Sequence, residues 1–367
     1  PDGDGAIFGR NDGQLVNEDS AEWGLGHKRL AIIDLSDDGR QPMTSCDKQM
    51  WITLNGEIYN YIELKRELEA EGIHFSTATD TEVVLAAYNH WGKAAVERFV
   101  GMFAFVIVDI TKREVFACRD RLGIKPLYFL HKGSQIILVS EPKQLQAFDC
   151  FHPRVNLQQV TDFLTDGVIG HEPDKCFFED VHSVPAGHFL QWKLGQNSTI
   201  ETKRYWQPSF EARSLSWSEA VEKTRALFFE SIKMRLRADV VVGSCLSGGV
   251  DSSSVVGVVT KHFDYQMKTF SSCFSQANCN EKPYIEAVVN HCNTEPVYVY
   301  PSEYGAIEEL DKLLSHQDEP FSTLSIYAQW CVMKEARDAG VTVVLDGQGG
   351  DETLCGYRKF SFFHLKE

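Results

Sequence analysis

Apolar positions up to about residue 200 occur in short runs separated by turn residues. Runs of this length that are rich in β-branched and aromatic side chains are typical of strands, and their close spacing favours antiparallel sheet. Two stretches, Ile62 to Glu71 and Thr81 to Phe99, carry helical spacing instead. The pattern therefore predicts a layered α+β domain. The strand-like runs are MWITLNGEIYN, GMFAFVIVDI, EVFACRD, PLYFL, QIILVSE and GHFLQWK.

The pattern changes after a polar stretch at residues 195–213, which we interpret as a linker. Ser216 then precedes Glu219 by three positions, which is the capping-box signature of a helix start. Four β-rich runs follow, separated by segments of helical length, as expected of a doubly wound parallel sheet in an α/β domain. We predict domains at residues 1–205 and 206–367. The four runs are VVVGSCL, KTFSSCF, PVYVY and VTVVLDG.

Composition and charge narrow the functional classes. The chain has 367 residues, 43% of them hydrophobic, which is enough for two domains with separate cores. Its net charge of −16, with no basic stripe, argues against nucleic-acid binding. The ten cysteines show no metal-ligand spacing. No apolar run is long enough for a membrane span, and nothing resembles a signal peptide, so we expect a cytoplasmic protein.

The segment SGGVDSS, Ser247 to Ser253, carries the strongest chemical signal. It follows the run VVVGSCL and precedes an apolar helical segment. Gly248 and Gly249 allow backbone N–H groups to approach an anion, and a helix N-terminus adds partial positive charge. Two glycines alone could form an ordinary turn, but the flanking serines and Asp251 favour a phosphate site. The lysine pattern of a Walker loop is absent.

SGGVDSS resembles the pyrophosphate loop of ATP-pyrophosphatase enzymes, which cleave ATP to AMP and pyrophosphate. A second segment, LDGQGGDE from Leu345 to Glu352, resembles the second nucleotide and substrate loop of that family. Asp251 and Asp351 are candidates to hold Mg²⁺, which prefers oxygen ligands, although a loop aspartate can also simply cap a turn. The resemblance implies ATP contacts from Leu246, Ser247, Gly248, Gly249, Asp251, Ser252, Ser272, Asp346 and Gly347.

Four upstream segments match class II glutamine amidotransferases in order. Each has an ordinary structural interpretation by itself: Arg29 on the surface, Asn55-Gly56 in a hairpin turn, Asp80 as a helix N-cap. Together they favour the family resemblance. The segments are GHKRLAIID (Gly26 to Asp34), NGEIYN (Asn55 to Asn60), TDTE (Thr79 to Glu82) and GMFAFVIVD followed by RDRLGIKPLY.

The chemistry of glutamine explains these residue types. A guanidinium such as Arg29 suits the α-carboxylate, and a carboxylate such as Asp80 suits the α-ammonium group. The resemblance implies that the Asn55 side chain and the Gly56 N–H stabilise the oxyanion during amide hydrolysis. The predicted glutamine pocket comprises Arg29, Leu30, Ile32, Asn55, Gly56, Glu57 and Asp80.

The nucleophile in this family is an N-terminal cysteine, and the sequence given does not contain one. We expect that a first strand bearing it is missing ahead of Pro1, because PDGDG resembles an interior stretch of relatives. We also expect that the second domain continues beyond Glu367. A protein without a working glutaminase is the alternative.

The two domains together resemble glutamine-hydrolysing asparagine synthetases. The resemblance implies that aspartate, glutamine and ATP give asparagine, glutamate, AMP and pyrophosphate through β-aspartyl-AMP. Gln348 departs from the family, whose best-known members have a glutamate there, and an amide cannot act as a base. Alternatives are an amidotransferase for another carboxylate on a sugar or peptide, a cyclase of the β-lactam synthetase type, and an inactive regulatory relative. The sequence leaves open whether the protein forms a homodimer.

Overall fold

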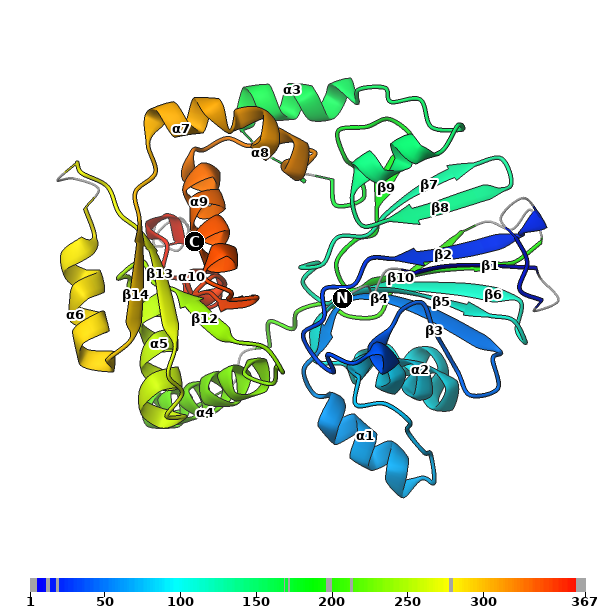
Figure 1. The fold of residues 1–367 in the computed structure, drawn as a ribbon, viewed down its shortest axis with the longest axis horizontal. Coiled ribbons are helices and arrows are strands. Elements are labelled where there is room, and N and C mark those ends of the chain that lie inside the picture. The colour runs from blue at the N-terminus through cyan, green and yellow to red at the C-terminus, as the bar shows by residue number, and fades with distance from the viewer. Residues whose placement is uncertain are drawn as a thin grey trace. The chain divides into compact units, whose positions relative to one another are not determined.

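The computed structural model describes residues 5–10, 14–17, 20–167, 169–170, 172–195, 200–211, 214–276 and 280–360. The chain divides into two compact units, Pro1–Ala212 and Arg213–Glu367 (Figure 1). The division falls near the end of the polar stretch at residues 195–213, a few residues after the boundary that the sequence predicts.

A six-stranded antiparallel sheet forms the centre of unit 1. Its order is β11-β10-β6-β5-β4-β3. Side chains alternate between two cores, as a pleated strand requires: Phe103 and Phe105 join one core, whereas Val106 and Val108 reach the other. The strands are β3 (Met43–Thr44), β4 (Met50–Ile58), β5 (Gly101–Asp109), β6 (Glu114–Arg119), β10 (His188–Lys193) and β11 (Glu201–Arg204).

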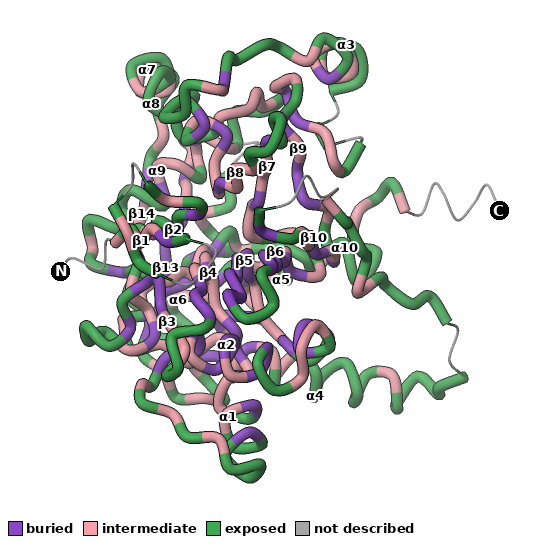
Figure 2. Tube along the Cα trace, turned by 90° about the vertical axis from the view of Figure 1, so that its right-hand side faces the viewer, coloured by how far each residue is buried: buried purple, intermediate pink, exposed green. Residues whose placement is uncertain are grey.

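Helices cover one face of this sheet. They are α1 (Tyr61–Ala70) and α2 (Asp80–Trp91), with the 3₁₀ segment η3 (Gly92–Glu97) after α2. Figure 2 shows the buried positions concentrated along β4, β5, β6 and α2. Val84, Tyr88 and Ala95 are buried in this core, as the helical spacing predicts, although a turn of 3₁₀ helix begins at Gly92.

Two smaller sheets provide the other layer of unit 1. One pairs β1 (Gly5–Gly9) with β2 (Trp23–His27), and the other has the order β8-β7-β9. The α+β class with layered antiparallel sheets is therefore confirmed. The remaining elements are β7 (Tyr128–Lys132), β8 (Gln135–Val139), β9 (Val181–Ser183), α3 (Leu157–Asp166), η2 (Asp37–Gly39) and η4 (Pro142–Ala147).

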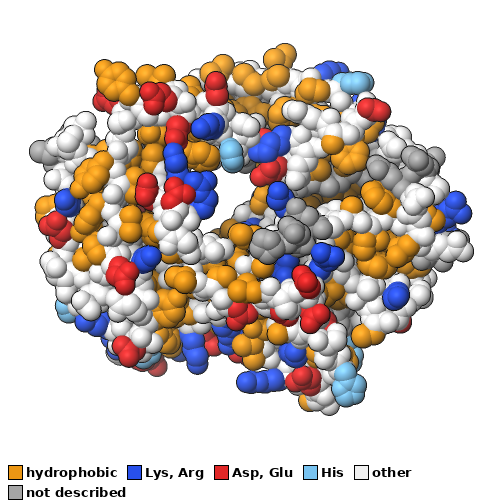
Figure 3. Space-filling view, in the orientation of Figure 1, with side chains coloured by type: hydrophobic (Ala, Val, Ile, Leu, Met, Phe, Trp, Pro, Cys, Tyr) orange, Lys and Arg blue, Asp and Glu red, His pale blue; other side chains and the backbone are white. Residues whose placement is uncertain are grey.

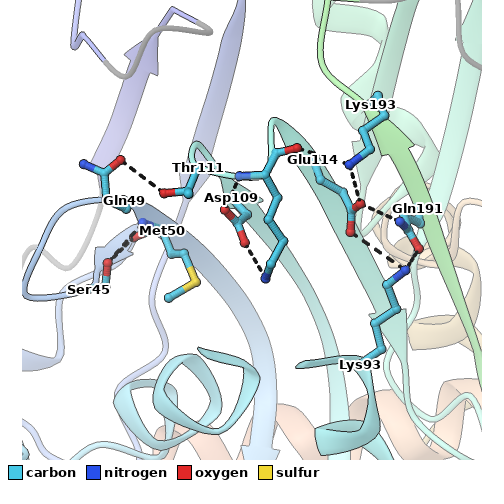
Figure 4. Close-up of polar contacts among 10 residues, drawn as sticks. Ser45, Gln49, Met50, Lys93, Asp109, Thr111, Glu114, Gln191 and Lys193 are labelled. Atoms are coloured by element: carbon cyan, nitrogen blue, oxygen red, sulfur yellow. Dashed lines mark hydrogen bonds and ion pairs between the residues drawn. The ribbon is translucent and has the colours of Figure 1, made fainter. Parts of the chain in front are cut away.

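Buried charges tie the strands of the main sheet together at one end (Figure 4). The Glu114 carboxylate on β6 lies 3.1 Å from Lys193 and 4.0 Å from Lys93, and accepts a 2.5 Å hydrogen bond from Gln191. Lys93 also donates to the Gln191 amide oxygen. These contacts join β6, β10 and η3, because each buried charge needs partners.

Unit 2 contains a four-stranded parallel sheet of order β14-β13-β12-β15. Its strands are β12 (Val242–Cys245), β13 (Lys268–Ser272), β14 (Glu295–Val299) and β15 (Val343–Leu345). The chain proceeds outward from β12 to β14 and then returns to the other side of β12. The point of return lies between β12 and β15, and ligands of such sheets bind where the strand order reverses.

Helices lie on both faces of the parallel sheet, which confirms the α/β class. One core joins α4 (Trp217–Arg235), α5 (Val250–His262) and α6 (Lys282–Cys292) to the sheet, and α9 (Ser325–Asp338) packs in the other. The capping box predicted at Ser216 and Glu219 starts α4. Short helices α7 (Glu303–Glu308), α8 (Leu310–Gln317) and α10 (Gly350–Leu354) complete the unit.

Among the described residues, no helix is long and apolar enough to cross a membrane. On the face shown in Figure 3, the coloured basic side chains are interspersed with acidic ones and form no continuous stripe.

Candidate functional site

The predicted residues of unit 1 come from three segments that hydrogen bonds hold together: the loop after β2, the second half of β4 and the start of α2. Asp34 in the loop accepts a 3.1 Å hydrogen bond from the Ala78 N–H, just before α2. Asp80 accepts a 2.9 Å bond from the Ile58 N–H at the end of β4. The fold thus assembles residues that are about fifty positions apart in sequence.

The Arg29 guanidinium shapes the loop that carries it. Its Nη1 donates to the Ser36 carbonyl at 3.0 Å, and its Nη2 donates to the carbonyls of Ile33 at 2.9 Å and Asp34 at 2.5 Å. Its charge also helps to lower the pKa of Asp34, after the larger effect of the Ser36 hydroxyl. Arg29 is half-buried. Through these three hydrogen bonds, the group expected to bind a carboxylate also holds its own loop in place.

A glycine on β4, Gly56, leaves the backbone at the site without a side chain. Gly56 has a φ of +127°, and a β-carbon there would lie 2.0 Å from the Met102 carbonyl oxygen on β5. Only glycine fits this position. The neighbouring Asn55 donates from Nδ2 to the Ser140 hydroxyl at 3.4 Å, which links β4 to the end of β8. A backbone N–H beside an amide donor is the arrangement that an oxyanion needs.

Two carboxyl groups, Glu57 and Asp80, lie in this low-dielectric region. Burial and, to a smaller extent, the charge of Asp80 raise the pKa of Glu57 to about 7, against the opposing effect of Lys125. Burial likewise raises the pKa of Asp80 to about 6, against the hydrogen bonds from Ile58 and Thr81. Glu57 Oε1 is buried and has no hydrogen-bond partner among the described residues. A cation that entered here would stabilise both carboxylates.

Of the other predicted pocket residues, Ile32 is half-buried and the Leu30 side chain is exposed. Their expected contribution is through the backbone, and Leu30 directly follows Arg29.

No sequence motif points to the residues that position this site. Gln41 is buried, accepts a 2.6 Å hydrogen bond from the Leu54 N–H and donates to Thr81 at 3.3 Å, so it joins β4 to α2. The buried carboxylate of Asp120 accepts four backbone hydrogen bonds, from Phe103, Leu122, Ile124 and Lys125. Gln41 lies just before β3 and Asp120 just after β6, and both are buried polar groups, which need partners.

In unit 2, the loop after β12 is closed by its own serines. The Ser252 hydroxyl accepts a 3.2 Å hydrogen bond from the Ser247 N–H and lies 3.0 Å from the Ser247 hydroxyl. Gly248 has a φ of +80°, and a β-carbon there would lie 2.9 Å from Tyr284 on α6. The loop leads into α5, whose first N–H groups lack partners within the helix. This is the geometry of an anion site.

The loop after β15 contacts the start of α5 directly. A β-carbon on Gly347 would lie 2.8 Å from the Ser252 backbone nitrogen, and one on Gly350 would lie 2.3 Å from Asp251 Oδ2. The structure therefore brings the two predicted loops into van der Waals contact at the point where the strand order reverses. The glycines are needed because the backbones pass so closely.

Further predicted residues lie at the carboxyl ends of the strands. Leu246 is buried in the core. Ser272 ends β13 two residues past the Cys245–Phe270 pairing, and its buried hydroxyl has no partner among the described residues. Asp346 is exposed, and its Oδ1 accepts from the Gln348 N–H at 3.1 Å. Burial, and then the Asp346 charge, raises the pKa of Cys245 to about 12, so the thiol stays protonated.

The protein offers few ligands for a metal ion. No group of three or more His, Cys, Asp or Glu side chains that could hold a metal occurs in the part of the chain that the structure describes. Asp251 and Asp351 both add to the raised pKa of Tyr357, whose largest cause is its hydrogen bond to Glu352, so both lie within electrostatic reach of one phenol. Two carboxylates suit Mg²⁺ that is bound mainly by substrate phosphates.

Comparison with known proteins agrees with this geometry. The family described as "Glutamine amidotransferase domain" matches residues 9–206, and the family described as "Asparagine synthase" matches residues 223–367. These two matches place a glutamine amidotransferase domain and an asparagine synthase domain in one chain. The chain belongs to the family of glutamine-hydrolysing asparagine synthetases.

Relatives support the assignment to the family over most of the chain. Asparagine synthetase [glutamine-hydrolyzing] 1 of Bacillus subtilis is 36% identical over 338 residues, which cover 91% of this chain and 52% of the relative. Putative asparagine synthetase [glutamine-hydrolyzing] 2 of Methanocaldococcus jannaschii is 37% identical over 355 residues, 91% and 67% of the two chains. Amidase chyE of Penicillium rubens is 30% identical, covering 94% and 52%. The chain thus spans about half the length of the Bacillus relative.

Proposed function

We propose that this protein makes asparagine from aspartate, with glutamine as the nitrogen donor and ATP as the energy source. The observation that carries the proposal is the contact between the loops after β12 and β15, where Gly347 and Gly350 meet Ser252 and Asp251. That contact unites an anion-binding loop with the loop expected to hold the acceptor, in a unit that matches the asparagine synthase family.

In unit 2, the residues around the loop suit ATP. The first turn of α5 and the N–H groups at Gly248 and Gly249 would bind the β- and γ-phosphates. The buried Ser272 hydroxyl supplies a further hydrogen-bonding group at the same edge of the sheet. Asp251 and Asp351 would hold Mg²⁺, and the ion would make pyrophosphate a better leaving group. The β-carboxylate of aspartate then attacks the α-phosphorus and displaces pyrophosphate, and ammonia displaces AMP from the acyl carbon.

In unit 1, the residues suit glutamine. Arg29 would bind the α-carboxylate through its Nε and remaining Nη1 hydrogens, since its other donors hold the loop. Glu57 and Asp80 would neutralise the α-ammonium group, which explains why two carboxyl groups of raised pKa lie together. Asn55 and the Gly56 N–H would stabilise the oxyanion. By resemblance to the family, the attacking group is an N-terminal cysteine thiol.

An ATP-dependent amidotransferase for another carboxylate is the second candidate, and Gln348 favours it. The side chain is exposed in the loop after β15, and a neutral amide there cannot accept a proton from the attacking amine. The nearest carboxylate in sequence on that loop, Asp346, already accepts the Gln348 N–H.

A labelling experiment on the full-length enzyme tests the proposal. Heavy oxygen in the acceptor carboxylate must appear in AMP, and pyrophosphate must form in step with the amide. Asp251→Asn should reduce this turnover at least about tenfold, as expected for a lost charged contact. Asp264→Asn, at an exposed position after α5, is the matched control and should retain activity.

The acceptor decides between the two candidates. If aspartate gives labelled AMP, and Gln348→Glu increases the rate, the asparagine assignment stands. If aspartate gives none in either version while another carboxylate does, that assignment falls and the second candidate replaces it.

A further inference from the structure

The loop after β15 has no acid at position 348 but carries one two residues earlier. Ammonia that attacks an acyl carbon becomes positively charged, so a base must remove a proton before the amide is complete. Gln348 is a neutral amide and cannot act as that base. Residues 346–354 contain three carboxyl groups, on Asp346, Asp351 and Glu352. The surroundings of these three groups distinguish them.

Two of the three carboxyl groups have other roles. Glu352 accepts a 3.0 Å hydrogen bond from the Gly349 N–H and a 2.8 Å hydrogen bond from the Tyr357 hydroxyl. Asp351 is a candidate ligand for Mg²⁺, and the charge of a bound metal ion opposes protonation of its ligand. Asp346 is exposed, and a carboxylate offers about four lone-pair sites. It therefore has room to accept a proton as well as its hydrogen bonds.

The Asp346 side chain folds back along its own loop. Its Oδ1 accepts the Gln348 N–H at 3.1 Å, so the carboxylate lies against the backbone of the residue that lacks the acid. Asp346 also directly follows β15, at the edge of the sheet where ligands of such folds bind. A base at position 346 and an acid at position 348 would thus serve the same part of the loop.

Groups on β12 and α9 hold the Asp346 side chain from outside its loop. The register of β12 and β15 pairs Ser244 with Leu345, so Cys245 and Asp346 follow side by side. The Cys245 thiol donates a hydrogen bond to the Asp346 carboxylate, because burial and the Asp346 charge raise its pKa to about 12 and keep it protonated. On α9, Gln329 Nε2 donates to the Cys245 sulfur at 3.8 Å. These contacts fix the direction of the carboxylate.

We propose that Asp346 is the proton acceptor of the amide-forming step in unit 2, and that Cys245 and Gln329 position its carboxylate. The inference rests on the proposed function, because it requires an acyl-adenylate. The lone pair of ammonia attacks the acyl carbon, and a carboxylate oxygen of Asp346 takes one proton from the nitrogen. The bond between the acyl carbon and the AMP oxygen then breaks, and AMP leaves with the electron pair. Asp346 returns the proton to solvent.

Separate assays of the two half-reactions test this in the full-length enzyme, with aspartate as acceptor and ammonia as nitrogen donor. Exchange of labelled pyrophosphate into ATP, without ammonia, measures adenylation. Asp346→Asn keeps the oxygen that accepts the Gln348 N–H, so exchange should be largely retained, while amide formation should fall at least about a hundredfold. Gln348→Glu in the Asp346→Asn background returns an acid to the loop and should restore at least about tenfold. Asp264→Asn is again the control and should keep both activities.

A second nitrogen donor separates a base from a structural residue. Hydroxylamine is less basic than ammonia and a better nucleophile, so its adduct loses a proton more readily and the defect of Asp346→Asn should be at least about tenfold smaller. The positioning role is tested at Cys245. Cys245→Ser keeps a hydrogen-bond donor and should keep most amide formation, whereas Cys245→Ala should lower it by about tenfold without a loss of exchange.

Two results would overturn the inference while leaving the proposed function in place. One is amide formation by Asp346→Asn at the wild-type rate, and the other is an equal loss of exchange and amide formation, which would make Asp346 a substrate-binding residue. Failure of Gln348→Glu to restore activity to Asp346→Asn would also count against a proton acceptor on this loop. Equal amide formation by Cys245→Ser and Cys245→Ala would exclude the positioning role. A wild-type enzyme without exchange would contradict the proposed function and the inference together.

Discussion

Glu57 shows how a single side chain can couple the predicted glutamine site of unit 1 to pH. Its folded-state pKa is raised from 4.5 to about 7, so between these values the folded state binds more protons than the unfolded state. Stability therefore falls as pH rises through this window. Asp80 contributes in the same sense between 3.8 and about 6. Burial makes the charged forms of these two carboxyl groups unfavourable, and a bound ammonium group would stabilise them.

We predict that Glu57→Gln stabilises unit 1 at pH 8 by on the order of 1–2 kcal/mol, a figure reduced for the partial exposure of the group. The effect should shrink toward pH 4, where the wild-type carboxyl group is protonated in both states. Urea unfolding at several pH values measures it. Glu69→Gln, an exposed position on α1, should leave the pH dependence unchanged. An equal stabilisation by Glu57→Gln at every pH would contradict the linkage.

At the scale of elements, the end of the main sheet depends on Glu114. Its buried carboxylate joins β6 to β10 and η3 through Lys193, Gln191 and Lys93. We predict that Glu114→Ala destabilises unit 1 by about 2 kcal/mol, because two lysines and an amide lose a shared partner. Denaturant unfolding measures the change.

The exposed pair of Glu67 and Arg98, at 2.6 Å, provides the comparison for Glu114. Glu67→Ala should cost less than about 1 kcal/mol, since water screens that pair. Similar losses in the two variants would show that burial does not determine the strength of these contacts.

The approach of two loops in unit 2 gives a second prediction at this scale. Gly347→Ala places a methyl group against the Ser252 backbone nitrogen, so the loop after β15 must move away from α5. We expect at least a tenfold loss of nucleotide affinity with little change in unfolding, as measured by titration calorimetry and thermal denaturation. Gly257→Ala, in the middle of α5 with open space around the site, should keep the affinity and slightly raise stability. Full affinity in Gly347→Ala would exclude the loop contact as part of the site.

The sequence predicts elements where hydrophobic spacing is regular and misses them where tertiary contacts replace it. All six strand-like runs of unit 1 are strands, and the four runs of unit 2 form the parallel sheet. β2 was not predicted because Gly24 and Gly26 give it low strand propensity. In the folded chain a β-carbon on Gly24 would lie 2.9 Å from the Phe8 ring, so the glycine is needed there. Helix α3 was not predicted, although its apolar residues Leu157, Val160 and Leu164 follow helical spacing.

The same distinction applies to the site. The resemblance to amidotransferases groups Arg29, Asn55 and Asp80, and the chemistry of glutamine is consistent with those residue types. It could not identify Gln41 or Asp120, whose role is to satisfy backbone groups of segments that meet only in the folded chain.

At the scale of the whole molecule, a substitution at the predicted glutamine site should impair the reaction of unit 1 and leave the reaction of unit 2 intact. We predict that Arg29→Ala, in a full-length enzyme, raises the glutamine requirement tenfold or more and leaves ammonia-supported synthesis largely intact. Steady-state assays with each nitrogen donor measure this. Arg29→Lys keeps the charge but loses the fork that holds residues 33–36, so it should recover only part of the activity. Equal damage with both donors would indicate a folding defect instead.

Gly56 and Gln348 differ in how freely they can mutate. At Gly56, any side chain meets the Met102 carbonyl oxygen, so every missense change in that codon is expected to be eliminated by selection. Gln348 is exposed on its loop, and one nucleotide change can give several other side chains there at no steric cost. Over evolutionary time, the loop after β15 can therefore change its chemistry at position 348 by drift, while the backbone at position 56 remains fixed.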